Sequence, residues 1–380
     1  MKQHTLVKLS VRGKLQEQLL TGYEDGDEVR SPMNIAVIGT GLIGRKHIGL
    51  ISENPKFRLA ATINPSGKPM DIPSLVDVPN YTACGEMLTS QAIDAAIIAS
   101  PNETHAEIAI ELIRGAIPIL IEKPITGDVE EGLRIIKAAR QYDVPVLMGH
   151  HRRYNPIIAE MRELASSGRL GALVGFSGVW SVFKPDPYYQ AAWRTGPTGG
   201  PIMINLIHEI DYLHAMFGRI AAVGAMIAPK RRTHSGEETM GVLLHFEQGA
   251  IGSIVLSDSA ASPWSWEQAT GENDPAFPMN GQNPYRFLFQ RGGVEFPSLK
   301  IWQQSTPNWN NPFEIEDLSR LRVPMRDVFA RQIDHFHDVA ARTAKPMVTA
   351  QDGLEALNVA LTMKQAIAEG RGFLDVPLLA

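Results

Sequence analysis

Residues 31–44 read Ser-Pro-Met-Asn-Ile-Ala-Val-Ile-Gly-Thr-Gly-Leu-Ile-Gly and give the clearest indication of the fold. The β-forming run from Asn34 to Ile38 predicts a strand, which is followed directly by Gly39, Gly41 and Gly44 and then by a helical pattern. At this spacing the first glycine permits a tight turn, the second lets the backbone approach a pyrophosphate, and the third lets the helix pack closely on its strand. The helix N-terminus would offer free N–H groups to the anion. The glycines alone would fit an ordinary turn, but the strand before them and the helix after them predict a dinucleotide site.

Strand and helix patterns alternate as far as about residue 150. Apolar strands are predicted at 34–38, 58–63, 94–99, 117–121 and 144–148, with helices at 44–53, 103–115 and 128–142. Such alternation predicts an α/β fold in which residues 33–150 form a Rossmann domain, a doubly wound parallel sheet. Ligands of such sheets bind beyond the carboxyl ends of the strands. The polar segments that follow the strands are therefore the candidates, at 64–68, 100–105, 122–124 and 149–154.

The pattern changes in the second part of the chain, at 151–345. Strands are predicted at 172–182, 220–228, 239–246, 250–257, 285–289 and 293–296, with a helix at 200–217. This predicts a C-terminal α/β domain with an open, mainly antiparallel sheet, and long loops at 258–284 and 303–324. A last helix, from an N-cap at Asp352 to Gly370, lies in a segment, 346–380, expected to pack back toward the Rossmann domain. The polar residues 1–32 are expected to form a flexible extension.

The composition is that of a globular enzyme. The chain has 380 residues, 44% hydrophobic and 20% charged, enough for two domains with substantial cores. A net charge of −5 gives no reason to expect nucleic acid or an anionic membrane as a partner. The single cysteine, Cys84, excludes an internal disulfide and suits a reducing cytoplasm. No apolar run approaches the roughly 20 residues of a membrane span, and charged residues interrupt the N-terminus where a secretory signal would be apolar. We therefore expect a cytoplasmic protein.

Four elements in order make the chain resemble the family of Gfo/Idh/MocA-type oxidoreductases. They are the turn at 39–44, Ser100-Pro-Asn-Glu-Thr-His105, Glu122-Lys-Pro124, and Gly199-Gly-Pro-Ile-Met-Ile-Asn-Leu-Ile-His-Glu-Ile-Asp211. The resemblance covers about residues 33–380. It implies a Rossmann domain paired with an α/β domain whose open sheet often makes dimers or tetramers, so a homodimer or homotetramer is expected. Members of this family mostly oxidise or reduce sugars, inositols and related cyclic alcohols with NAD or NADP.

Lys123 and His208 are the predicted catalytic residues. Hydride transfer from a carbinol needs a group that accepts the hydroxyl proton near the nicotinamide. Lys123 ends a buried strand, where desolvation would lower its pKa toward neutrality; a solvated surface lysine is the alternative. The resemblance implies that Lys123 acts on the substrate oxygen, that Glu122 touches the cofactor ribose, and that His208 is a near-neutral proton acceptor. Asp211, one helical turn further on, could orient the imidazole. No metal site is predicted, because a second histidine at zinc-helix spacing is missing.

One departure from the family concerns the proton relay. Many sugar-oxidising members carry an aspartate four residues before the histidine, and this chain has Ile204 there, with Asn205 as the nearest polar residue. Either Lys123 and His208 suffice, or the loop 184–189 contributes. Lys184 in that loop could bind a carboxylate or phosphate of the substrate, the alternative being a solvated loop lysine.

A second departure concerns the cofactor. NAD-specific sites usually place an acid on the ribose 2′-hydroxyl after the second strand, but here that strand ends in Asn64-Pro-Ser-Gly-Lys68. Asparagine does not repel a 2′-phosphate, and Ser66 and Lys68, with Arg45 nearby, could receive it. The sequence therefore modestly favours NADP over NAD. The other predicted cofactor-binding residues are Leu42, Ile43, Ser100, Pro101, Asn102 and His105, together with the glycines, Glu122 and Lys123.

The leading hypothesis is an NAD(P)-dependent dehydrogenase or reductase acting on a sugar, an inositol or a related cyclic alcohol. The predicted substrate-binding residues are His151, Lys184, Trp193, Asn205 and Asp211, and the aromatic residues expected to border the pocket are Trp180, Tyr188, Tyr189, Trp193, Trp264 and Trp266. Aromatic walls equally suit a dihydrodiol or hemiacetal. Two further hypotheses remain open: a cofactor-retaining enzyme that eliminates or hydrolyses glycosides, and a nucleotide-sensing protein without turnover.

Overall fold

The computed structural model describes residues 31–67, 77–196, 199–233, 236–272, 276–318 and 327–379. Residues 33–380 form one unit, distinct from residues 1–32. Of the predicted extension only residues 31 and 32 are described, and Lys68 also lies outside the described residues.

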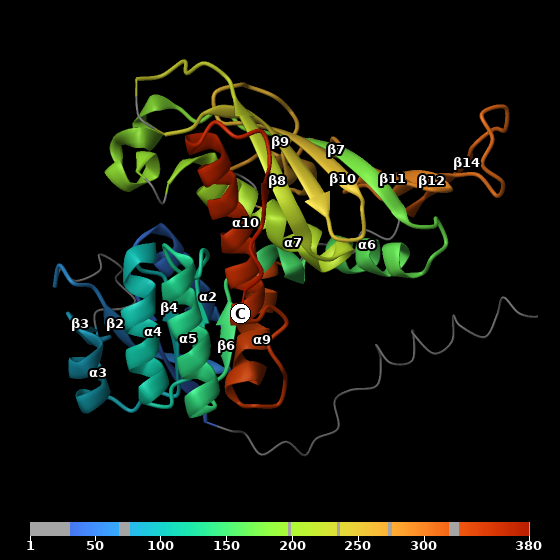
Figure 1. Ribbon diagram of the computed structural model, residues 1–380. Coiled ribbons are helices and arrows are strands. Elements are labelled where there is room, and N and C mark those ends of the chain that lie inside the picture. Colours follow the sequence, from blue (N-terminus) through green and yellow to red (C-terminus); the bar gives the residue numbers. More distant parts are fainter. Residues whose placement is uncertain are drawn as a thin grey trace, which may run out of the picture. The chain divides into compact units, whose positions relative to one another are not determined.

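The first sheet is six-stranded and parallel, in the order β3-β2-β1-β4-β5-β6 (Figure 1). Its strands are β1 (Met33–Ile38), β2 (Phe57–Ile63), β3 (Asn80–Tyr81), β4 (Ala95–Ile98), β5 (Ile119–Ile121) and β6 (Val146–Met148). Its helices are α2 (Leu42–Glu53), α3 (Cys84–Ser90), α4 (His105–Arg114) and α5 (Val129–Tyr142). The predicted doubly wound sheet is confirmed.

Both faces of this sheet are covered. In β1, Ile35 and Val37 pack into a core cluster with residues of α2 and of α9 (Val328–Ala340). Ala36 and Ile38 point to the other face, into the cluster that contains residues of α4 and α5. Burial on both sides explains why these strands are continuous apolar runs in the sequence.

The second sheet has nine strands in the order β14-β13-β12-β11-β7-β10-β9-β8-β15. Only β7 and β10 pair in parallel among these neighbours, so the predicted open, mainly antiparallel sheet is confirmed. Its strands are β7 (Leu173–Ser181), β8 (Ile220–Ile227), β9 (Thr239–Phe246), β10 (Ile251–Ser257), β11 (Tyr285–Phe289), β12 (Gly292–Phe296), β13 (Lys300–Gln303), β14 (Glu314–Asp317) and β15 (Leu374–Asp375).

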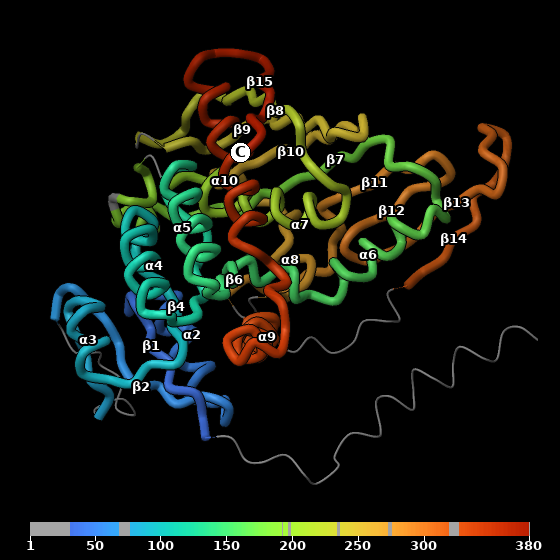
Figure 2. The backbone as a smooth tube through the Cα atoms, turned by 60° about the horizontal axis from the view of Figure 1, so that its bottom comes forward, coloured from blue at the N-terminus to red at the C-terminus, as the bar shows by residue number. Residues whose placement is uncertain are grey.

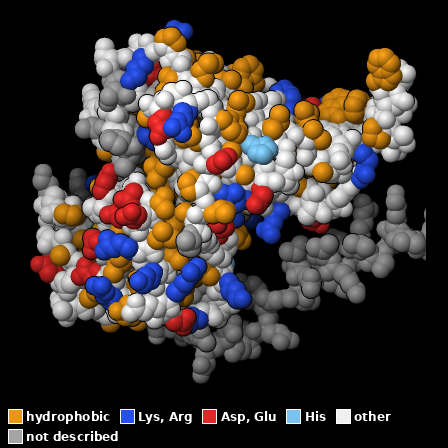
Figure 3. Space-filling model, viewed as in Figure 1, with side chains coloured by type: hydrophobic (Ala, Val, Ile, Leu, Met, Phe, Trp, Pro, Cys, Tyr) orange, Lys and Arg blue, Asp and Glu red, His pale blue; other side chains and the backbone are white. Residues whose placement is uncertain are grey.

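One face of the second sheet is packed and the other is exposed. The apolar residues of α7 (Ile207–Phe217) share a core cluster with the inward-facing side chains of β9 and β10. On the opposite face Leu243 is 53% exposed, Ile251 63% and Val255 49%. Hydrophobic side chains gather over these strands in Figure 3. This is the surface on which the predicted homo-oligomer would depend.

The remaining helical elements lie in both parts of the chain. They are α6 (Pro156–Ser166), α8 (Trp266–Thr270), α10 (Ala350–Ala368), 3-10 turns at Asn102–Thr104, His151–Tyr154, Asp186–Gln190 and Ala192–Thr195, and a π-helical turn at Ile202–Leu206 that leads into α7. Helix α10 contacts both α5 and α7, and Figure 2 shows it between them. It thereby joins the first sheet's helices to those of the second.

Some sequence-based boundaries were wrong. The N-cap of α10 is Thr349, not Asp352: the Thr349 side chain accepts a hydrogen bond from the Asp352 backbone, and the Asp352 carboxylate accepts one from that of Thr349. The expected loops contain α8 and β14, and α6 was not predicted. In the described part of the chain, no helix has both the length and the apolar character needed to cross a bilayer.

Candidate active site

The glycine-rich turn has the geometry that its sequence predicts. Gly39 has a φ of +91°, and a Cβ there would lie 2.5 Å from the Ala99 carbonyl oxygen. A Cβ on Gly44 would lie 1.9 Å from the Gly39 oxygen, whereas a Cβ on Gly41 would meet nothing within 4 Å. Gly41 is also the N-cap of α2, without a side-chain cap and without an acidic residue in the first turn. The turn therefore leaves a helix N-terminus open to an anion, which fits a dinucleotide pyrophosphate.

Asn64 and Ser66 form a compact turn at the end of β2. The Asn64 Oδ1 atom accepts hydrogen bonds from the Ser66 backbone at 3.2 Å and from the Ser66 hydroxyl at 2.9 Å. Arg45, also proposed near this turn, donates from Nε to the Thr40 carbonyl at 3.2 Å. The turn carries an amide where NAD-specific sites carry an acid.

His105 braces two loops of the first sheet. Its ring is fully buried, with Nε2 2.9 Å from the Ser100 carbonyl and Nδ1 3.1 Å from that of Pro124. Burial lowers its pKa. Both ring nitrogens thus lie near backbone carbonyls, so His105 positions the 100–105 loop against the turn after Lys123, and its contact with the cofactor stays a prediction.

Glu122 is held from the first helix of the Rossmann domain. Its Oε1 atom lies 2.7 Å from Nε2 of His47, which is buried in α2. Burial alone would raise the pKa of Glu122, but the hydrogen bond with His47 and nearby positive charge outweigh it and hold the pKa below its usual value. Glu122 is therefore a fixed carboxylate at the carboxyl end of β5. The role of His47 could not be predicted from the sequence.

Lys123 lies where β5 ends and reaches the second part of the chain. Its Nζ atom donates to the Ile204 carbonyl at 2.9 Å, so the residue at the relay position contributes a backbone acceptor in place of a side-chain carboxylate. Burial lowers the pKa of Lys123 to about 8, with Glu122 opposing and Arg152 reinforcing the change. An ammonium with this pKa can exchange a proton near neutrality.

Three buried histidines lie together beside this lysine. The ring centroid of His208 is 4.9 Å from that of His151 and 5.9 Å from that of His150. His151 lies 3.0 Å through Nε2 from the Glu272 carboxylate. Burial, reinforced by the charges of Lys123 and Arg152, lowers the pKa of His208 well below 6.5. Burial therefore favours the neutral form of the His208 ring, and its role as a proton acceptor stays a prediction.

Asp211 does not orient His208. Its two carboxylate oxygens accept hydrogen bonds from Arg153, at 2.9 Å from Nε and 2.8 Å from the terminal nitrogen, and it is 1% exposed. The nearest imidazole in the described structure is that of His150, whose Nδ1 atom is 3.9 Å away. Asp211 is thus part of a buried ion pair with Arg153 and does not orient His208, whereas its predicted role in substrate binding stays a prediction.

Lys184 is buried rather than solvated. Only 8% of the residue is exposed, and Nζ donates to the Asn205 side-chain oxygen at 2.6 Å. The ammonium also lies 4.9 Å from the centroid of the Tyr188 ring. Burial lowers its pKa to about 8, Asp258 opposing the change and Lys123 reinforcing it. The structure thus brings together three residues that the sequence selected, Lys123, Lys184 and Asn205.

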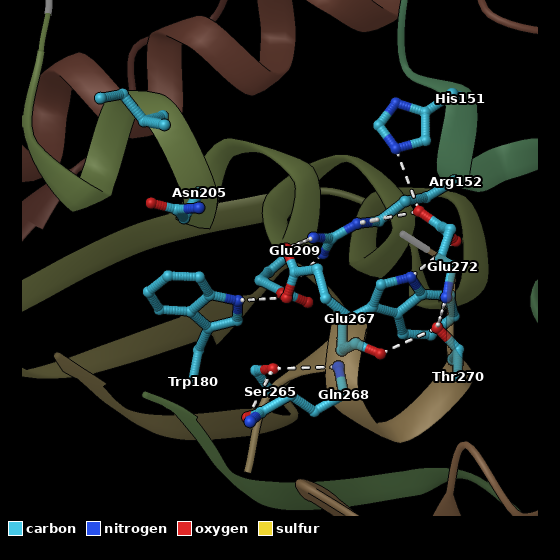
Figure 4. Close-up of polar contacts among 12 residues, drawn as sticks. His151, Arg152, Trp180, Asn205, Glu209, Ser265, Glu267, Gln268, Thr270 and Glu272 are labelled. Atoms are coloured by element: carbon cyan, nitrogen blue, oxygen red, sulfur yellow. Dashed lines mark hydrogen bonds and ion pairs between the residues drawn. The ribbon is translucent and has the colours of Figure 1, made fainter. Parts of the chain in front are cut away.

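A buried ionic cluster that the sequence did not predict supports the histidines (Figure 4). Arg152 donates to Glu209 at 2.7 Å and to Glu267 at 2.5 Å, and Glu272 lies 3.8 Å away. Burial raises the pKa of Glu209 to about 7. Hydrogen bonds from His151 and the charge of Arg152 overcome burial and lower the pKa of Glu272 to about 2. The one sequence signal for this cluster is the Arg152-Arg153 pair within the segment 149–154 that follows β6.

The aromatic residues divide between core and surface. Trp180 and Trp266 are buried, and their indole nitrogens donate to Glu267 and Glu272 at 3.1 and 2.8 Å. They therefore support the ionic cluster, which differs from the expected place at a pocket rim. Trp193 is 52% exposed, with the Arg194 guanidinium 5.4 Å from its ring centroid. No set of three or more His, Cys, Asp or Glu side chains among the described residues could hold a metal ion.

Two family models match this chain, one in the part that carries the first sheet and one in the part that carries the second. Residues 33–150 match the model of an oxidoreductase family with an NAD-binding Rossmann fold, and residues 158–277 match that of the GFO/IDH/MocA C-terminal domain. An inositol 2-dehydrogenase of Corynebacterium glutamicum is 26% identical over 234 residues, which are 59% of this chain and 67% of the relative.

Solved structures show the same fold over most of the chain. A putative NADPH-dependent oxidoreductase from Desulfitobacterium hafniense superposes with a TM-score of 0.75 at 18% identity, covering 91% of this chain and 98% of the other. The WlbA dehydrogenase from Chromobacterium violaceum, solved with NADH and UDP-GlcNAcA, gives 0.74 at 20% identity, covering 93% and 98%.

Proposed function

This chain belongs to the Gfo/Idh/MocA family of oxidoreductases with an NAD-binding Rossmann domain, and we propose that it transfers a hydride between nicotinamide C4 and a carbinol or carbonyl carbon of a sugar, inositol or related cyclic alcohol. The observation that carries the proposal is Lys123. This lysine has a pKa of about 8 at the carboxyl end of β5. On the same edge of the sheet, the neighbouring strand β4 leads to the 100–105 loop and β1 to the glycine turn.

In the proposed mechanism, Lys123 accepts and returns the proton of the substrate hydroxyl. Hydride exchange is the chemistry that a bound nicotinamide supplies. In the oxidation direction neutral Lys123 accepts the proton of the carbinol hydroxyl at Nζ as the hydride leaves the same carbon, and reduction reverses both transfers. His208 stays neutral and holds the substrate oxygen by a hydrogen bond. Its low pKa makes it unsuitable as the resting proton carrier.

Because residue 204 is an isoleucine, this proton transfer has no relay aspartate. The backbone carbonyl of Ile204 holds Lys123 at 2.9 Å and thereby aims the amine. Protons reach solvent from Lys123 directly, because that residue is partly exposed. The two residues predicted as catalytic thus suffice for the reaction.

The dinucleotide would be held by the turn at 39–44, the 100–105 loop, Glu122 and the Asn64–Ser66 turn. The open backbone at Gly41 and the uncapped N-terminus of α2 support the binding of a dinucleotide pyrophosphate at this turn. The amide of Asn64 does not repel a 2′-phosphate, so NADP is proposed to bind at least as well as NAD.

A cofactor-by-substrate screen tests this function. Purified protein is mixed with NAD or NADP and a panel of inositols, aldoses and cyclic diols, and the absorbance of the reduced nicotinamide is followed. Turnover that is lost in Lys123→Met supports the proposal. Tight cofactor binding with glycoside cleavage and no net reduction would favour the cofactor-retaining alternative, and binding with no chemistry would favour a sensor.

A further inference from the structure

Two ammonium groups converge on consecutive residues of the π-helical turn Ile202–Leu206. Lys123 donates to the Ile204 carbonyl at 2.9 Å, and Lys184 donates to the Asn205 side-chain oxygen at 2.6 Å. Both acceptors are neutral. Where the aspartate of many family members would offset one charge, this chain has an isoleucine.

The acids near these lysines already have other cations. Asp258 lies 3.9 Å from Lys184 but accepts a hydrogen bond from Arg232 at 3.2 Å and one from the Tyr189 hydroxyl at 2.6 Å. Glu267 is bound by Arg152. Asp258 is therefore shared between Lys184 and Arg232, and Glu267 is held by Arg152.

Arg194 adds a third cation to the same region. Its guanidinium carbon lies 4.0 Å from the centroid of the Tyr188 ring, the ring that also lies 4.9 Å from Lys184 Nζ. One terminal nitrogen donates to the Tyr188 carbonyl at 2.6 Å, and the buried Nε atom has no hydrogen-bond partner in the described structure. No ion pair joins Arg194 to a carboxylate within the described residues.

We infer that the substrate of the proposed dehydrogenase carries a carboxylate, bound by Lys184 with Arg194 as the second cation, so that the substrate class is a polyhydroxylated acid such as an aldonate or uronate. The inference rests on the proposed function. One ammonium that shares its nearest carboxylate with Arg232, beside a planar guanidinium, suits a monoanionic carboxylate better than a dianionic phosphate ester. Burial lowers the pKa of both lysines to about 8, and Asp258 and Glu267 oppose the change at Lys184.

The substrate carboxylate would also explain why Lys184 is buried. A buried ammonium is costly without a counter-charge, and the bound anion supplies it. Lys123, directed to the neighbouring residue of the same turn, is then free to act on a hydroxyl of the same molecule. The two lysines thus divide binding and proton transfer between them.

Matched pairs of ligands test the inference. Titration calorimetry on the full chain saturated with reduced cofactor compares D-galacturonate with D-galactose and D-gluconate with D-glucitol, with acetate and tartrate as simple carboxylate probes and a sugar phosphate as the phosphate arm. The variants are Lys184→Met and Lys184→Arg. The matched control is Lys137→Met, an exposed lysine on α5.

Wild-type protein and Lys137→Met should prefer the acid of each pair by about 10- to 100-fold, the range expected for one charge-assisted hydrogen bond. The preference should vanish in Lys184→Met and survive in Lys184→Arg, with cofactor affinity unchanged in both as the check on folding. Equal affinities of the wild-type protein for the acid and the neutral ligand overturn the inference. So does a preference for the acid that survives in Lys184→Met. A sugar phosphate bound better than the acids overturns the carboxylate assignment.

Binding and turnover separate this inference from the proposed function. Acids that bind through Lys184, with neither acids nor neutral polyols oxidised, would leave the carboxylate site standing and refute the dehydrogenase. If neutral polyols are oxidised as fast as acids and Lys184→Met has no effect, the dehydrogenase stands and the carboxylate inference is refuted.

Discussion

Replacing Lys123 with methionine should abolish catalysis and stabilise the fold at the same time. Methionine keeps most of the apolar length of the side chain but removes the ammonium. The folded protein lowers the pKa of Lys123 from 10.5 to about 8. At ~1.4 kcal/mol for each pH unit, the fold disfavours the charged lysine by about 3 kcal/mol at neutral pH.

Two effects reduce the gain from the substitution. The residue is partly exposed, so water offsets part of the cost. The Ile204 carbonyl also loses its hydrogen bond from Nζ, worth about 1 kcal/mol. We expect a net stabilisation of about 1–2 kcal/mol at pH 7, and a rise of a few degrees in the midpoint of thermal unfolding.

The pH dependence of the stability difference has a definite sign. Below pH 8 Lys123 is charged in both the folded and unfolded chain, and the cost of its charge is fully present. Between pH 8 and 10.5 the folded protein has lost this proton while the unfolded chain retains it, so stability rises with pH and the cost declines. The advantage of Lys123→Met should therefore be largest at pH 7 and small near pH 10.

Thermal unfolding from pH 7 to pH 10, with Lys137→Met as control, measures this difference, and steady-state assays measure turnover. Wild-type oxidation should rise with pH to a plateau above about 8, and the variant should lose about 10²–10⁴-fold in turnover together with that rise. A variant that turns over normally, or whose stability advantage grows toward pH 10, would refute the reasoning.

Three further predictions concern the histidine, the cofactor and the exposed sheet. His208→Gln should lower turnover by at least tenfold yet keep the pH dependence near 8, since His208 is already neutral; loss of that dependence in rate measurements would contradict the assignment to Lys123. Wild-type protein should bind NADP at least as tightly as NAD, and Asn64→Asp should shift the preference toward NAD; titration calorimetry with both nucleotides decides this, and a strong wild-type preference for NAD would disprove it. Light scattering should report a dimer or tetramer that Leu243→Asp with Ile251→Asp dissociates; a wild-type monomer at micromolar concentration would exclude the interface.

The sequence by itself determined the features that depend on neighbours along the chain. The glycine turn needs a strand before it and a helix after it, and these are adjacent in sequence, so Gly39, Gly41 and Gly44 could be interpreted directly. Burial on both faces made the strands of the first sheet continuous apolar runs. Lys123 could be selected because the residues that end parallel strands meet at one edge of the sheet.

Only the tertiary structure decided which charges meet. Arg152 pairs with Glu209 and Glu267, which lie 57 and 115 residues further along the chain. Arg153 takes up both oxygens of Asp211, which sequence spacing had assigned to His208. A helical periodicity tells which side chains share a face, but the partner across that face comes from another element, and the desolvation that shifts a pKa comes from everything packed around it. Lys184 is a loop lysine in the sequence and a buried cation beside Asn205 in the fold for that reason.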